Sequence, residues 1–198
     1  MYSINKNIDN TIIIKKSKFI TKIYKINSID EVNNIINILK CEYKDATHIC
    51  YAYILNGIEK CVDDGEPSGT AGLPILNVLK HNNLNYILAV VIRYFGGIKL
   101  GAGGLVRAYS NSITETLKLA TISKLVKGYA IKISFTYDNT KEVDNLLKNI
   151  NINNKQYNDS IIYEFNISCD DYNVIFNELK NLTEIFFKEE ILITKENC

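Results

Sequence analysis

The residues best suited to binding a charged ligand are concentrated in one stretch of this chain, Gly65 to Arg107. Lysine outnumbers arginine 21 to 2, and both arginines, Arg93 and Arg107, lie in this stretch. The stretch also holds eight of the 10 glycines and both prolines. An arginine offers a planar, always-charged fork that a lysine does not reproduce. Two arginines in a chain otherwise rich in Ile, Asn, Lys and Tyr therefore indicate that such forks are needed here.

The loop after the strand expected at 86–95 has the composition of an anion-binding turn. A strand, a glycine-rich loop and a helix start bring backbone amides and the positive end of a helix dipole together. Between Pro67 and Thr114 the chain carries four Lys or Arg and no Asp or Glu, so the local field is positive. We expect phosphate or a nucleic-acid backbone to bind here. The candidate residues are Arg93, Lys99, Gly101, Gly103, Gly104 and Arg107.

This loop matches neither of two common nucleotide-binding motifs. No Gly-Lys-Ser/Thr follows it, and Val106 stands where GxGxxG requires its last glycine. Hydrolysis of nucleoside triphosphates and dinucleotide redox chemistry are therefore poor interpretations. The alternative to anion binding is a structural loop, in which paired glycines only permit a strand and a helix to pack closely.

An acidic cluster, Asp63, Asp64 and Glu66, precedes the basic part of this stretch. Three carboxylates within four residues could hold Mg²⁺ or act as acid and base. They could equally pair with Arg93 or Arg107 and set the loop geometry. We favour pairing or orientation, because a metal site usually needs more ligands than one loop supplies.

His48 is a minor candidate site residue, since it would share one face of a strand with Cys50. The spacing of these residues fits no structural zinc pattern, and packing is the commoner role of such a pair. The sequence thus names no catalytic residue and no cofactor other than the Mg²⁺ alternative.

Composition limits the possible classes of protein. The 198 residues allow one domain or two small ones, and hydrophobic and charged fractions of 46% and 23% are ordinary for a folded soluble protein. The net charge of +1 gives no global polyanion-binding signature. We find neither a membrane span nor a signal peptide. The five cysteines form no CxxC pair, so we expect reduced thiols and a cytoplasmic protein.

Hydrophobic periodicity predicts an α+β chain with two domains, 1–127 and 128–198. In the first domain we expect strands at 17–26, 48–55, 58–62 and 86–95, and helices at 28–41, 70–80 and 105–120. In the second we expect strands at 129–137, 155–157, 160–168 and 184–190, with helices at 140–150 and 172–182. That β-α-β-β-α-β order is ferredoxin-like. Gly128, the only glycine after Gly104, marks the expected boundary.

Four segments together resemble the Impact/YigZ family: SKFI at 17–20, ATHICYA at 46–52, DDGEPSGTAG at 63–72 and RYFGGIKLGAGGLVRAY at 93–109. They occur in the family's order, and the last two are long and specific. The resemblance covers about residues 15 to 120. The second half looks like the smaller C-terminal domain of bacterial YigZ-type members. We do not recognise the RWD domain that eukaryotic Impact proteins carry.

The resemblance implies a first domain similar to the second domain of a small-subunit ribosomal protein. It implies a second domain similar to ferredoxin-like domains of elongation factor G, a link to translation, and nucleic-acid binding by analogy of fold. The family supplies no settled enzymatic activity.

Three functional hypotheses follow. The first is a regulatory protein that binds RNA or the translation machinery through the glycine-rich loop, with a protein partner on the C-terminal domain. The second is an enzyme acting on a phosphorylated or nucleotide-like small molecule through Asp63, Asp64 and Glu66. The third is an interaction scaffold whose loop is only structural. A deep pocket joining the two motifs would favour the second, and buried ion pairs of both arginines would favour the third.

Overall fold

The chain forms two compact units in the structure, a computed structural model that describes residues 1–195. The units are Met1–Ser123 and Lys124–Cys198. The division falls four residues before the boundary that we expected between 127 and 128, which instead lies inside strand β7 (Ile122–Phe135). Gly128 is buried in that strand, and a Cβ there would lie 2.5 Å from the carbonyl oxygen of Ile167. It permits close approach within the sheet and is not a linker residue.

The first unit is built on an antiparallel sheet with the strand order β2-β3-β6-β4-β5. Its strands are β1 (Tyr2–Ile4), β2 (Ile8–Ile14), β3 (Ser17–Lys25), β4 (His48–Leu55), β5 (Ile58–Val62) and β6 (Ile87–Tyr94). Its helices are α1 (Ile29–Glu42), α2 (Gly72–His81) and α3 (Ala102–Leu117). We predicted neither β1, which is too short for a periodic signal, nor β2.

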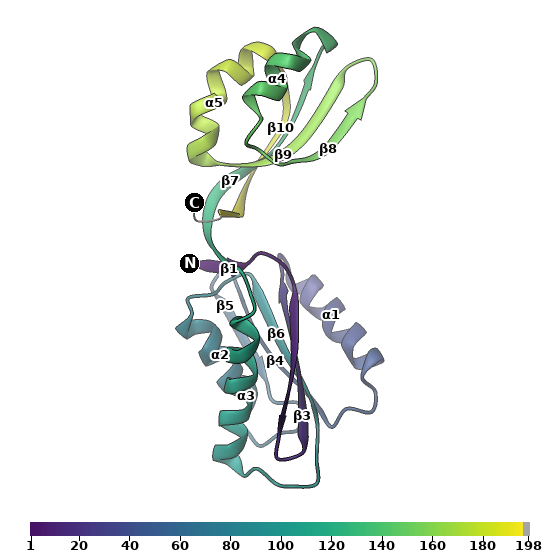
Figure 1. Ribbon diagram of the computed structural model, residues 1–198, viewed down its shortest axis with the longest axis vertical. Helices are drawn as coiled ribbons and strands as arrows, with labels where there is room; N and C mark the ends of the chain where they lie inside the picture. Colours follow the sequence, from purple (N-terminus) through teal and green to yellow (C-terminus); the bar gives the residue numbers. More distant parts are fainter. Residues whose placement is uncertain (196–198) are drawn as a thin grey trace. The chain divides into compact units, whose positions relative to one another are not determined.

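Strand β6 lies at the centre of this sheet and is buried on both faces, as its continuous apolar run predicted. Alternate residues of β6 enter two separate cores. One core includes Ala89 and Val91 with side chains of α2 and α3, and the other includes Leu88 and Val90 with side chains of α1. Figure 1 shows α1 on one face of the sheet and α2 and α3 on the other.

Two helix starts determine how the loops enter the helices. Ser28 caps α1 as expected, since its Oγ accepts a hydrogen bond from the Glu31 amide at 3.1 Å. Helix α3 begins at Ala102, three residues before the start that we expected. Gly101, with φ of 72°, stands at its N-cap, where only glycine is unstrained. Gly103 and Gly104 therefore belong to the first helical turn and not to the loop.

The second unit has the predicted ferredoxin-like topology. Besides β7 it contains β8 (Ile152–Tyr157), β9 (Ile161–Ser168), β10 (Glu184–Lys195), α4 (Thr140–Leu146) and α5 (Cys169–Leu182), and a short 3₁₀ turn, Tyr137–Asn139, precedes α4. Antiparallel pairing gives the order β10-β7-β9-β8. Both helices cover one face of this sheet (Figure 1), over a core that contains Ile133, Tyr163 and Phe165. The α+β fold class is thus confirmed.

No helix within residues 1–195 combines the length and the apolarity that a membrane crossing requires.

The contact of Gly96 with the β2–β3 turn provides a test of this fold. A Cβ at Gly96 would overlap the carbonyl group of Lys16 and the amide nitrogen of Ser17, both of which are backbone. We expect Gly96→Ala to destabilise the first unit by about 1–3 kcal/mol or more. Gly103→Ala is the control, because a Cβ there meets open space in a helix and should be neutral or slightly stabilising. Urea unfolding of both variants measures the difference, and equal stabilities would contradict the close packing.

Candidate functional site

A buried carboxylate, that of Glu66, connects the acidic motif to the arginine-containing motif. Its side chain is 3% exposed. One oxygen, Oε1, accepts hydrogen bonds from Arg93 Nη1 at 2.5 Å and from the Tyr109 hydroxyl at 2.8 Å. An ionised group is buried only where an opposite charge and hydrogen bonds compensate it. Arg93 and Tyr109 supply both, so these three side chains hold the loop, β6 and α3 together.

His48 completes one side of this network. Its Nδ1–H donates to the backbone carbonyl of Asp64 at 2.8 Å, because a carbonyl oxygen can only accept. Its Nε2 lies 3.9 Å from Glu66 Oε2, which is too long for a direct hydrogen bond. The structure therefore brings His48, Asp64 and Glu66 together, as one orienting group.

Asp63 organises the segment that leads into α2. Its carboxylate accepts the backbone amides of Gly69 at 2.8 Å, Ala71 at 3.0 Å and Gly72 at 2.8 Å. Burial alone would raise the pKa of Asp63, but these three amides outweigh burial and lower the pKa below its ordinary value. The N-cap residue of α2 makes no side-chain capping hydrogen bond. The ionised Asp63 carboxylate caps this helix start instead, by accepting its backbone amides.

The carboxylates of the acidic motif point at separate partners. Asp64 Oδ2 accepts the Ile49 amide at 2.6 Å, Asp63 holds the three amides and Glu66 holds Arg93. Among the described residues no group of three or more His, Cys, Asp or Glu is arranged to hold a metal ion. The orienting role that we favoured for this motif fits these contacts, and the Mg²⁺ alternative finds no ligand cluster in them.

Arg93 lies in the interior, which differs from the phosphate-binding role that we expected for it. The residue is 5% exposed, and its guanidinium lies between the rings of Phe19 and Phe95, with its carbon 5.4 Å and 5.6 Å from the ring centres. The charge is already compensated by Glu66. The physical reason is the strand alternation, which directs Ala89, Val91 and Arg93 to the face that packs on α3.

Two further members of the network, Cys50 and Tyr109, were not among the site residues that we predicted from the sequence. The Cys50 Sγ lies 2.9 Å from the Asp63 carbonyl oxygen and 3.3 Å from the Tyr109 hydroxyl. Burial raises the pKa of the Cys50 thiol to about 12 and also raises the pKa of Tyr109. Both groups are therefore protonated at neutral pH, and Cys50 is a hydrogen-bond donor and not a nucleophile.

The start of α3 presents a second, exposed group of residues. No side chain caps this helix, so the first-turn amides of Ala102, Gly103 and Gly104 are available as donors. Lys99 and Arg107 are exposed on either side of this turn, and neither forms an ion pair with a described residue. These amides and cations form the part of the predicted anion site that remains open to a ligand.

A cleft of about 280 Å³ joins the two motifs. Its lining combines the buried pair, the exposed loop and several apolar side chains: Glu66, Pro67, Arg93, Phe95, Lys99, Leu100, Gly101, Ala102 and Leu105. The structure thus places the glycine-rich loop next to the acidic motif, although about 30 residues of chain separate them.

Residues 15–117 match the family described as the Impact N-terminal domain, which is more than half of this chain. The chain belongs to the IMPACT family. The IMPACT family member YvyE of Bacillus subtilis is 46% identical over 119 residues, which cover 59% of this chain and 55% of YvyE. An IMPACT family member of Haemophilus influenzae is 38% identical over 138 residues, or 67% of each chain. The matched region thus spans little more than half of YvyE.

Comparison with solved structures extends the similarity beyond the Impact domain. A crystal structure described as that of a hypothetical protein matches 98% of this chain and 97% of its own, with a TM-score of 0.59 and 25% identity. The two-domain translational regulator Yih1 matches 60% of this chain and 46% of its own, with a TM-score of 0.35 and 18% identity, which is too low to carry an argument. The α+β fold of this IMPACT family chain therefore has a structural relative that matches both of its units.

Removing the Glu66 charge should destabilise the first unit strongly. Glu66→Gln leaves the buried Arg93 guanidinium without its counter-charge, which costs about 3–5 kcal/mol. Glu59→Gln is the matched control, because it changes the same group in an exposed pair with Lys80 at 2.8 Å, where about 0–1 kcal/mol is expected. Hydrogen exchange of the β6 amides measures both variants. Similar losses in the two would mean that the buried pair contributes no more than a surface pair.

The lowered pKa of Asp63 predicts an acid-dependent stability. A depressed folded-state pKa contributes stability above the ordinary aspartate pKa, and this contribution is lost as the pH falls through the lowered value. Asp63→Asn should therefore lower stability at neutral pH and reduce its loss as the pH falls below about 4. Unfolding by urea above and below this pH, with Asp9→Asn as an exposed control, tests the sign. A pH profile unchanged by Asp63→Asn would contradict it.

Proposed function

We propose that this IMPACT family chain is a translation-associated regulatory protein that binds RNA or the ribosome through the start of α3. The observation that carries the proposal is a separation of charges. Arg93 and Glu66 neutralise each other in the interior, whereas Lys99 and Arg107 are exposed without a described counter-charge. The surface of this segment is therefore positive even though the net charge of the chain is only +1.

The geometry suits a phosphate group. Backbone amides of Gly103 and Gly104 at the helix N-terminus would donate to its oxygens, and Gly101 leaves their approach free of a side chain. Lys99 and Arg107 would contribute charge from either side. Such contacts fix a nucleic-acid backbone without reading its sequence. Arg93 would take part indirectly, by holding the loop against Glu66 and Ser17.

The link to translation is supported by what the family resemblance implies. The ferredoxin-like unit would orient the first unit or bind a protein partner, and we propose no catalytic step for it. Ribosome co-sedimentation is the experiment that follows the measurement of RNA binding, because it tests whether the chain associates with the translation machinery.

A second candidate is favoured by the cleft of about 280 Å³ that joins the two motifs. It would admit a small phosphorylated molecule, with Lys99 and the α3 amides at one end and Glu66 at another. The contacts of Asp63 and Asp64 with backbone amides leave Glu66 as the one carboxylate that lines the cleft.

The test of the first candidate is RNA binding at two salt concentrations. We expect affinity for fluorescent single-stranded RNA to fall steeply with salt, by about one log unit in slope for each phosphate contact. Lys99→Ala and Arg107→Ala should each weaken binding and reduce the slope by about 1. Lys40→Ala is the control, since Lys40 lies on α1 at the opposite face of the sheet and should leave binding unchanged.

Circular dichroism should show that all three variants remain folded, because the changed side chains are exposed. Binding that is indifferent to Lys99 and Arg107 would overturn the RNA proposal. Saturable binding of nucleoside monophosphates without RNA binding would instead support the second candidate.

A further inference from the structure

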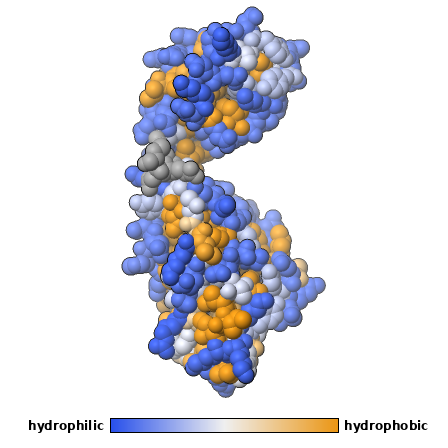
Figure 2. Space-filling view, viewed as in Figure 1, coloured by the Kyte–Doolittle hydropathy of each residue, from blue (hydrophilic) through white to orange (hydrophobic). Residues whose placement is uncertain are grey.

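A second hollow lies on the first unit, between α3 and the turn that joins β2 to β3. Its volume is about 620 Å³, which is within the range of natural ligand sites. The side chains of Ile14, Leu100, Val106 and Ala108 form an aliphatic lining. Figure 2 shows apolar surface on this face of the unit, bordered by hydrophilic surface. Val106 is 39% exposed there and adds to the apolar surface of the hollow.

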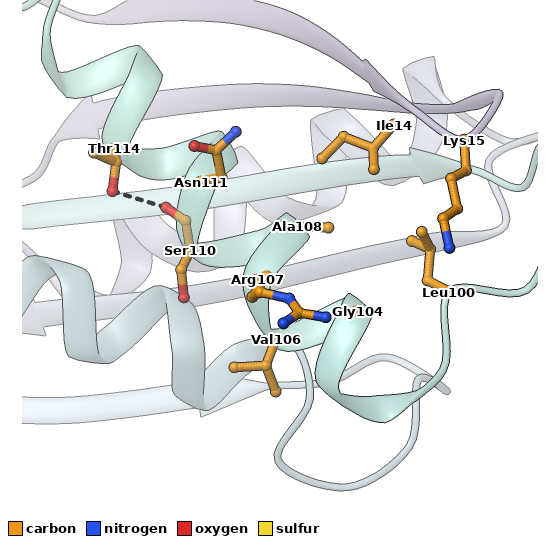
Figure 3. A pocket seen from close by; sticks show the side chains of 10 residues that line it. All are labelled: Ile14, Lys15, Leu100, Gly104, Val106, Arg107, Ala108, Ser110, Asn111 and Thr114. Carbon is orange, nitrogen blue, oxygen red and sulfur yellow. Dashed lines mark hydrogen bonds between the residues drawn. The ribbon is translucent and has the colours of Figure 1, made fainter.

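The charged side chains that line this hollow are all positive. Lys15 and Arg107 line it, and none of the described residues that line it is acidic. Figure 3 shows Lys15 extending from the β2–β3 turn past Leu100, while the guanidinium of Arg107 lies towards Gly104. Ser110 and Asn111 add neutral hydrogen-bonding groups along α3. The hollow is thus aliphatic in its lining and cationic on two sides.

The turn that carries Lys15 is strained. Ile14 pairs with Ser17, so Lys15 and Lys16 form a two-residue hairpin loop, and both have positive φ, 45° and 65°. Asn-Gly is the favoured sequence for such a loop, because other residues disfavour the left-handed region. Asparagine is abundant in this chain, so a relaxed turn was available to it. Lys15, which lines the hollow, is held in this strained turn, and that points to a use of its charge.

We infer that this hollow docks an acidic peptide segment of a partner protein, with aliphatic side chains in the hollow and carboxylates on Lys15 and Arg107. Charge complementarity selects the acidic partner. The aliphatic lining favours a peptide over nucleic acid, because the bases of single-stranded nucleic acids bind mainly by stacking on aromatic side chains. No aromatic residue lines the hollow. This inference goes beyond the proposed function and does not rest on it.

The test uses the full chain and three labelled peptides. In the first, single leucines are separated by pairs of glutamates; the second has lysine for each glutamate, and the third has serine for each leucine. We expect fluorescence anisotropy to show binding of the first peptide at about tenfold higher affinity than either control. Addition of the first peptide should shift the amide resonances of Lys15, Val106 and Asn111.

Two variants separate docking from RNA binding, and both avoid Arg107, which also borders the proposed phosphate site. Val106→Ser should weaken the acidic peptide about fivefold and leave RNA affinity unchanged, since no charge is altered. The double variant Lys15→Asn with Lys16→Gly should weaken the peptide about five- to tenfold while raising Tm by about 2–4 °C, because it relieves the strained turn.

Equal binding of the three peptides, or resonance shifts confined to other surfaces, would overturn the inference. The same holds if Val106→Ser leaves peptide affinity unchanged, or if RNA shifts these resonances at affinities that the peptide cannot match. Loss of RNA binding in Lys99→Ala with retained peptide binding would support two separate sites.

Discussion

The structure of the first unit depends on a charge removed from water. The Glu66 carboxylate has little exposure, and its compensation requires a strand residue, Arg93, and a helix residue, Tyr109, at fixed positions. A buried ion that loses one partner is costly, so the three elements that supply these groups are constrained together. Asp63 and Asp64 then fix the remaining backbone of the acidic loop through amides. The acidic motif is therefore a connector between elements, and its charges are used within the protein.

This internal compensation determines what the surface can offer. Arg93 compensates the charge of Glu66 in the interior, whereas Lys99 and Arg107 are exposed and form no ion pair with a described residue. The uncapped start of α3 adds donors at the same place. On the other side of Leu100, the aliphatic hollow uses Arg107 and the strained Lys15 turn. Leu100 lines both the cleft and the hollow, so the two surfaces share one side chain.

Sequence alone predicted the features that local patterns encode. The capping box of α1, the doubly buried β6 and the ferredoxin-like order each arise from short-range periodicity or cap chemistry. The glycine-rich loop at a helix start was predicted as well, but its helix began earlier. Pairing of the acidic motif with Arg93 was among our expectations, but the burial of this pair and the contact with Tyr109 were not, because Tyr109 stands 43 residues from Glu66 in the chain. Arg93 alternates with Ala89 and Val91 on one face of an apolar strand, and this spacing was a signal that could have indicated its burial.

The central position of β6 also constrains the order in which the chain can fold. Strands β3 and β4 are neighbours in sequence but not in the sheet, because β6 lies between them. The hairpins β2–β3 and β4–β5 are local and can form early, but each then presents an unpaired edge that only β6 covers. During synthesis from the N-terminus, both edges stay open until β6 has left the ribosome. During synthesis the chain thus passes through a stage in which both hairpins have formed but the strand that pairs with each of them, β6, is still absent.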